Sequence, residues 1–152
     1  MLETSPSLRN SGFTLIEVLI SMIVLVGGLV AAAAVFAYAT STAHRAERQS
    51  LAAFLVQGKI EQLRTLAPDR LPPGGSLDGL SPDSDYSEYM ITTRGTRARV
   101  TLNPAEADLL RVWRIDGTNP VRISVAVYSM NTMLATPNTP LAFGSTSRAR
   151  RL

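Results

Sequence analysis

A long apolar run near the N-terminus is the strongest pattern in the chain. From Val18 to Ala43 no side chain carries a charge. As an α-helix this run would be about 39 Å long, more than the roughly 30 Å of a membrane's hydrocarbon core. We therefore predict a membrane-spanning helix over residues 13–43, preceded by a short polar segment, residues 1–12.

After Thr40 the pattern becomes amphipathic. The positions at helical spacing on the side expected to pack are Leu51, Phe54, Leu55, Gly58, Gln62 and Leu66, with Ala52, Val56, Ile60 and Leu63 alongside. The polar side is assigned to Arg45, Arg48, Gln49, Lys59, Glu61 and Arg64. Because no strong helix breaker intervenes before Pro68, we predict one helix from Phe13 to Leu66. Residues 44–66, its amphipathic continuation, should lie against a sheet.

Residues 67–85 are rich in proline, glycine and aspartate, which is typical of a solvated loop. Alternating or β-branched segments then predict strands at residues 86–93, 97–102, 109–116 and 121–128. In the last of these, Val121, Ile123, Val125 and Val127 should point onto the long helix. The expected fold class is α+β, with a small antiparallel sheet over residues 86–130. Residues 131–152 are expected to form a flexible basic tail, with room for one edge strand.

The apolar run opens with the sequence Gly12-Phe13-Thr14-Leu15-Ile16-Glu17-Val18-Leu19. A carboxylate within a membrane-spanning helix costs roughly 2.5–3.5 kcal/mol at the bilayer centre and less near the interface. Glu17 therefore either lies among the lipid headgroups or has a cationic partner. If the chain were cut after Gly12, Phe13 would gain a free amine one helical turn from Glu17.

This motif resembles the class III signal of type IV pilins and type II secretion pseudopilins, and the resemblance covers the first 55 to 65 residues. It implies that a prepilin peptidase removes residues 1–12 by cutting between Gly12 and Phe13, and that the new Phe13 amine is N-methylated. It also implies that Glu17 pairs with the amine of a neighbouring subunit during assembly. No cofactor is expected.

The resemblance further implies a single-pass protein of the bacterial inner membrane, with a periplasmic C-terminal domain that later joins a pilus or pseudopilus. Its partners would be other pilins or pseudopilins. Within the family, the chain looks most like minor pilins of the PilV type, and the I-type pseudopilin of type II secretion is the alternative.

Three features depart from common pilin patterns. Many major pilins carry a kinking proline in the apolar run, but no proline lies between Pro6 and Pro68. Instead Gly27 and Gly28 interrupt it, either as a soft point or as small-residue packing pairs with Ala31 and Ala32. There is no cysteine, whereas many pilins have a C-terminal disulfide. The positive-inside rule also gives no support, because Arg9 precedes the run while Arg45 and Arg48 follow it.

A competing interpretation is an ordinary cleavable signal peptide, since residues 31–34 are all alanine. The run is longer than the apolar region of such a peptide, and Glu17 interrupts it. A mature chain starting near Val35 would identify this alternative.

The sequence contains no arrangement of residues typical of an enzyme. It has no cysteine and a single histidine, His44, without the ligand cluster that a metal site would need. Net charge is +3, carried by 14 arginines and one lysine. Arginines 94, 97, 99, 111, 114 and 122, near Trp113 and Tyr128, suggest one further hypothesis, a DNA-binding minor pilin for DNA uptake. Its contacts would be Arg97, Arg99 and Arg114. The alternative is that these arginines are ordinary outward-facing strand residues.

Overall fold

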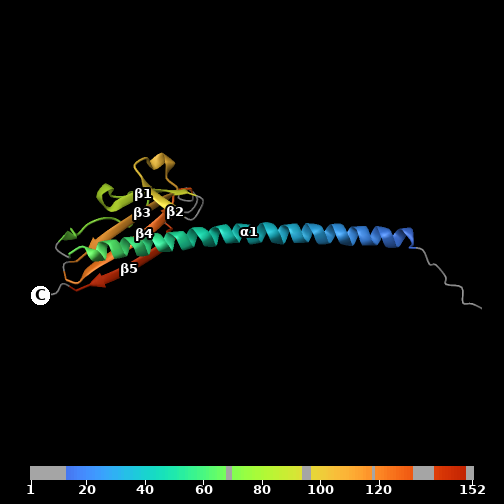
Figure 1. The fold of residues 1–152 in the computed structure, drawn as a ribbon, viewed down its shortest axis with the longest axis horizontal. Helices are drawn as coiled ribbons and strands as arrows, with labels where there is room; N and C mark the ends of the chain where they lie inside the picture. Colours follow the sequence, from blue (N-terminus) through green and yellow to red (C-terminus); the bar gives the residue numbers. More distant parts are fainter. Residues whose placement is uncertain (1–12, 68–69, 94–96, 118, 132–138, 150–152) are drawn as a thin grey trace, which may run out of the picture. The chain divides into compact units, whose positions relative to one another are not determined.

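The computed structural model describes residues 13–67, 70–93, 97–117, 119–131 and 139–149. The chain divides into two units, residues 1–42 and 43–152. Helix α1 (Leu15–Thr65) begins in the first unit and ends in the second (Figure 1). The predicted leader, residues 1–12, lies outside the described residues.

Helix α1 confirms the helix predicted from Phe13 to Leu66 to within two residues at each end. It is unbroken through Gly27 and Gly28. The hydroxyl groups that follow the apolar run are satisfied within the helix itself. Thr40 Oγ1 donates to the Ala37 carbonyl (2.9 Å), and Ser41 Oγ donates to that of Tyr38 (2.8 Å). These residues can therefore stay helical without an external hydrogen-bond partner.

The second unit contains one five-stranded sheet in the order β2-β1-β3-β4-β5, in which every pair of neighbours is antiparallel. The strands are β1 (Ser87–Thr93), β2 (Arg97–Thr101), β3 (Leu109–Asp116), β4 (Val121–Ser129) and β5 (Ala142–Arg148). Short 3₁₀ turns, η2 (Ser84–Tyr86) and η3 (Pro104–Glu106), precede β1 and β3. The α+β fold, with a long helix packed on an antiparallel sheet, is thus confirmed.

The four predicted strands agree with β1 to β4 to within one residue at each end. Strand β5 lies in the segment expected to be a flexible basic tail with room for one edge strand, and it is such an edge strand, so the sheet extends beyond residue 130. It forms an edge by pairing with β4, from Val127–Ala142 to Val121–Arg148. The other edge is β2, because β1 pairs with β2 on one side and with β3 on the other.

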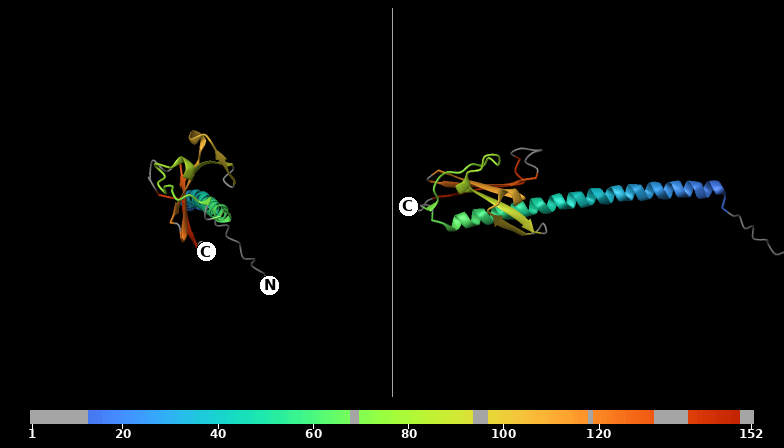
Figure 2. Two further views of the ribbon diagram at one scale, coloured as in Figure 1. Left: turned by 90° about the vertical axis from the view of Figure 1, so that its left-hand side faces the viewer. Right: turned by 90° about the horizontal axis from the view of Figure 1, so that it is seen from above.

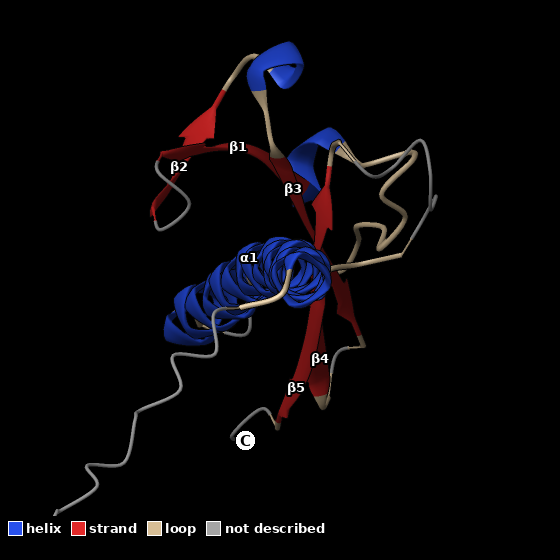
Figure 3. Ribbon diagram, turned by 90° about the vertical axis from the view of Figure 1, so that its right-hand side faces the viewer, coloured by secondary structure: helices blue, strands red, loops and turns tan. Residues whose placement is uncertain are grey.

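The main core lies between the sheet and residues 51–63 of α1. Figure 2 shows this part of α1 lying across one face of the sheet, and Figure 3 shows β1 and β2 curving toward the side on which the helix lies. The helix contributes Leu51, Ala52, Leu55, Val56, Ile60 and Leu63. The three valines and one isoleucine predicted to face the helix from β4 all lie in this core: Val121, Ile123, Val125 and Val127. Four positions of the predicted packing face are exposed instead: Phe54 (74%), Gly58, Gln62 and Leu66.

The opposite face of the sheet is covered in part by the segment between α1 and β1. Leu110, Val112, Ala126 and Tyr128 form a second buried cluster there, against which Leu77 packs. The Tyr128 hydroxyl donates to the Leu77 carbonyl (2.6 Å). Burial raises the pKa of Tyr128, and the charge of Asp78 adds to the effect. The expectation of a solvated loop is therefore wrong for this part of the segment.

Candidate functional site

The first candidate site is the start of helix α1. Phe13 is 82% exposed, and the helix begins two residues later at Leu15. The backbone amide of Glu17 donates to the Thr14 carbonyl (3.0 Å), so Glu17 lies in the first turn. A carboxylate in this position interacts favourably with the positive end of the helix dipole. Gly12, on the other side of the predicted cleavage bond, lies outside the described residues.

The first unit is apolar and unpartnered. Every described residue of this unit is exposed, including Leu15, Ile16 and the aliphatic residues through Val35. Within the described part of the chain, α1 is the one helix long and apolar enough to cross a membrane, by length and composition, with a mean hydropathy of 2.7 in its apolar stretch. Apart from the neighbouring residues and backbone of its own helix, an added Cβ at Gly27 or Gly28 would meet no described atom within 4 Å. We predicted that a helix packs on Gly27, Gly28, Ala31 and Ala32. Such a helix would have to come from another chain, and this role stays a prediction.

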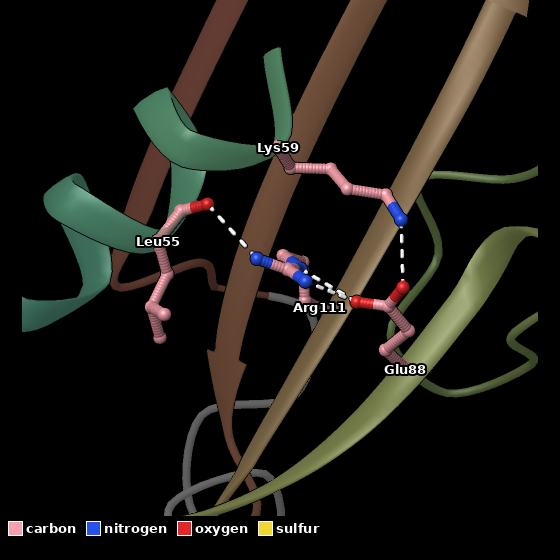
Figure 4. Close-up of polar contacts among 4 residues, drawn as sticks. All are labelled: Leu55, Lys59, Glu88 and Arg111. Carbon is pink, nitrogen blue, oxygen red and sulfur yellow. Dashed lines mark hydrogen bonds and ion pairs between the residues drawn. The ribbon is translucent and has the colours of Figure 1, made fainter. Parts of the chain in front are cut away.

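The second unit contains an ionic cluster, with two buried cations and a partly buried carboxylate, that connects α1 to the sheet (Figure 4). The Lys59 ammonium donates to Glu88 Oε1 (2.6 Å). Arg111 donates from Nε to Glu88 Oε2 (3.0 Å) and pairs with the same oxygen through Nη2. Its remaining nitrogen, Nη1, donates to the Leu55 carbonyl of α1 (3.2 Å).

This cluster combines two cations with one carboxylate. Lys59 and Arg111 are 5% and 9% exposed. The Lys59 nitrogen lies 3.7 Å from the centre of the Trp113 ring, a cation–π contact that offsets part of the cost of its burial. Burial alone would raise the pKa of Glu88, but hydrogen bonds from Lys59 and Arg111, together with their charges, outweigh it and lower this pKa. The cluster therefore holds the helix on the sheet while Glu88 stays ionised.

Sequence reasoning missed this cluster. It placed Lys59 on the polar side of the helix and grouped Arg111 with the exposed arginines, and both assignments are wrong. A signal was present, because Lys59 lies four residues after Leu55 and four before Leu63, on the apolar stripe. The partner of Lys59 could not be read from the chain, since Glu88 is 29 residues away.

The three arginines proposed for DNA contact do not form one patch. Arg97 and Arg99 are exposed on β2, and Arg114 is exposed on β3, where its Nε donates to Asp116 (2.7 Å). Strand β1 serves as a common ruler, because it pairs with both β2 and β3. Arg99 of β2 is level with Ile91, whereas Val112 of β3 is level with Ser87, and Arg114 lies two residues further on. Six residues of extended chain separate the two levels, about 20 Å. Contact with DNA through these residues stays a prediction, and Arg111 cannot take part because it is buried.

His44 lies in the lining of an open hollow of about 270 Å³ formed by α1 and the ends of β1, β3 and β4. The ring nitrogen Nδ1 is 3.9 Å from Glu47 Oε2. Nearby, Asp108 accepts hydrogen bonds from the Thr92 amide (2.9 Å) and hydroxyl (2.7 Å), which lower the pKa of this carboxyl. Among the described residues, no group of three or more histidine and carboxylate side chains could hold a metal ion.

Comparison with known proteins identifies the N-terminal segment. Residues 7–35 match the family model described as the prokaryotic N-terminal methylation motif. The chain carries a prepilin-type signal. No curated protein and no solved structure matches the chain.

The matched segment includes Gly12, Phe13 and Glu17, and it extends into the apolar part of α1. It supports a type IV pilin-like or pseudopilin-like protein that is processed as a prepilin, and the motif belongs to structural subunits rather than to catalysts. The motif implies processing by a prepilin peptidase and assembly with other pilins, and together with the apolar helix it indicates membrane anchoring.

Proposed function

We propose that the chain is a minor pilin, a structural subunit of a type IV pilus that is inserted through its N-terminal helix. The observation that carries this proposal is the match of residues 7–35 to the N-terminal methylation motif, on a helix that continues unbroken into the core of a small α+β domain. Such a helix can serve both as the membrane anchor before assembly and as the central helix of a filament.

The proposed roles of individual residues follow from this function. The bond between Gly12 and Phe13 is the cleavage site, and the Phe13 amine is methylated by the same processing system. Glu17 neutralises the Phe13 amine of a neighbouring subunit. The chain is held in the inner membrane by one pass, with the second unit in the periplasm.

Processing can be tested by intact mass spectrometry of the full chain recovered from membranes. We expect a mature chain that starts at Phe13 and carries a methylated amine. The cleavage-site variant Gly12→Arg should stay unprocessed, because a bulky cation replaces the residue without a side chain at the bond that is cut. A mature chain starting near Val35 would instead identify an ordinary signal peptide and would refute the proposal.

The alternative is a pseudopilin of a type II secretion system. The motif and the fold suit both, so a deletion of the gene in its own host decides between them. Loss of surface pili with normal protein secretion supports the pilus subunit. Loss of secretion with normal pili supports the pseudopilin.

A further inference from the structure

An open groove lies between residues 51–55 of α1 and the edge strand β2. It has a volume of about 500 Å³ and is lined by Leu51, Phe54, Leu55, Thr93, Arg97, Ala98 and Arg99. Leu51 and Leu55 are buried and form an apolar floor, whereas the Phe54 ring is 74% exposed on the helix. A large exposed aromatic side chain at the edge of an apolar groove is typical of an interaction surface.

The other side of this groove is basic. Arg97 and Arg99 are both exposed, and neither pairs with a carboxylate among the residues that the structure describes. In contrast, exposed Arg64 and Arg114 pair with Glu61 and Asp116. A partner that fits the groove should therefore combine an apolar side chain with acidic groups.

The chain itself carries such a segment at residues 78–85. Leu80 is 58% exposed, and it is flanked by Asp78, Asp83 and Asp85. Two of these carboxylates also fix the local backbone: Asp78 accepts from the Leu80 amide (2.9 Å), and Asp83 accepts from the Asp85 amide (3.1 Å). The segment is thus held in shape before any partner binds, which lowers the entropic cost of docking.

Groove and acidic segment lie at opposite ends of strand β1. The acidic segment leads through η2 into Ser87, whereas the groove includes Thr93 at the other end of the strand. Six residues of strand separate these ends, about 20 Å. Two different complementary surfaces on one subunit make a head-to-tail contact, which can continue from copy to copy.

We propose that the groove binds residues 78–85 of a second copy of this chain, with Leu80 against Phe54 and the aspartates facing Arg97 and Arg99. The proposal deepens the proposed function, on which it rests, because it names a contact between the second units of neighbouring subunits.

The natural absence of cysteine permits a direct test in the full-length chain in membranes. A chain carrying both Phe54→Cys and Leu80→Cys should form a ladder of disulfide-linked dimers, trimers and longer species on mild oxidation. Each single variant should give dimers at most, and producing the two single variants together in the same cells should give the mixed dimer. Phe143→Cys with Leu80→Cys is the matched control, because Phe143 is also exposed (59%) but lies on β5, at the other edge of the sheet. A ladder with the control pair and none with the proposed pair would overturn the proposal.

Charge reversal tests the recognition itself. Arg97→Glu with Arg99→Glu, in the two-cysteine chain, should slow ladder formation about tenfold or more, because like charges then face each other. Adding Asp85→Arg to that chain should restore the ladder, at least in part, while the Asp83 carboxylate that holds the backbone is kept. Arg122→Glu, an exposed change on β4, should leave it unchanged. A ladder that is insensitive to the arginine changes, or that Asp85→Arg does not restore, would contradict the proposed contact.

The cysteine-free parent separates this proposal from the proposed function. If the parent is cut at Phe13 and enters sheared filaments while the proposed cysteine pair gives no ladder, the docking contact is wrong and the pilin assignment stands. If the parent is not cut at Phe13, the proposed function fails, whatever the cross-linking shows.

Discussion

At the scale of single residues, the ionic cluster around Glu88 decides how the helix is held on the sheet. One carboxylate bridges two buried cations that come from α1 and β3. Removing one member of such a group leaves the others buried without compensation, and this typically costs about 3–5 kcal/mol. The sequence shows these charged residues but not the contacts that join them through Glu88. A lysine and an arginine are usually exposed, and this favoured a surface position for Lys59 and Arg111.

We expect Glu88→Gln to destabilise the second unit by about 3–5 kcal/mol, because two cations then lose their shared counter-ion. Chemical denaturation of the full chain in detergent, followed through Trp113 fluorescence, measures this change. Glu61→Gln is the matched control, since its partner Arg64 lies on the exposed surface of the same helix. Equal stability of Glu88→Gln and the parent would contradict the role of the cluster.

The lowered pKa of Glu88 also predicts a pH dependence. A carboxyl whose pKa is lower in the folded state contributes stability that is present above its unfolded-state pKa of about 4.3. That contribution is lost as the pH falls through the folded-state pKa. The parent should therefore lose more stability than Glu88→Gln between pH 7 and acid pH. Asp108, whose pKa is also lowered, affects both chains alike. Parallel stability curves for the two chains would refute the prediction.

At the scale of elements, the helix and the first four strands could be predicted closely because each carries its own local signal. Alternating apolar residues mark β3 and β4, and glycine and proline mark the turn between them. Strand β5 has the sequence Ala-Phe-Gly-Ser-Thr-Ser-Arg, whose small and polar residues give a weak signal. Strand order could not be predicted, because it depends on contacts between segments far apart in the chain.

Close packing against α1 explains why β5 has a glycine, Gly144, at a position where a strand favours a larger residue. A Cβ added there would lie 2.7 Å from Val56 Cγ1 and 3.1 Å from Ile60 Cδ1, so the helix and the strand approach each other closely. We expect Gly144→Ala to destabilise the second unit by about 1–3 kcal/mol through overpacking.

Gly58→Ala is the opposite control for this close approach. Gly58 lies on the exposed side of α1, where an added Cβ would have no described atom within 4 Å apart from its own neighbours and helix backbone. The substitution should therefore stabilise the helix by about 1 kcal/mol. Thermal unfolding of the two variants should shift the midpoint in opposite directions. A Gly144→Ala chain as stable as Gly58→Ala would show that the core accommodates the extra methyl group.

At the scale of the whole molecule, the two units need different surroundings. The second unit buries its own apolar residues between helix and sheet. The first presents exposed apolar side chains along the described helix, which require a membrane or other helices around them. The motif at residues 12–19 predicted this requirement from sequence alone, because an apolar run with one carboxylate at a fixed position is a local feature.

Glu17 is the residue on which assembly should depend. In the proposed filament its carboxylate neutralises the Phe13 amine of an adjacent subunit, so that two charges enter an apolar bundle as a pair. Each would carry a desolvation cost of several kcal/mol if left unpaired. Glu17→Val removes one partner and leaves the amine uncompensated, and filament incorporation should fail. Membrane insertion and cleavage before Phe13 should persist, because the apolar run and the cleaved bond are unchanged.

The measurement compares processed protein in membranes with protein in sheared filaments, for the parent, Glu17→Val and Glu61→Val. The last of these makes the same chemical change at an exposed position of the same helix. We expect Glu61→Val to enter filaments at the parent level and Glu17→Val to accumulate in membranes as mature protein. If Glu17→Val is cleaved and assembles normally, Glu17 is an interfacial carboxylate without a pairing role. If it is not cleaved, the residue acts on processing before assembly, and the prediction that cleavage persists is wrong.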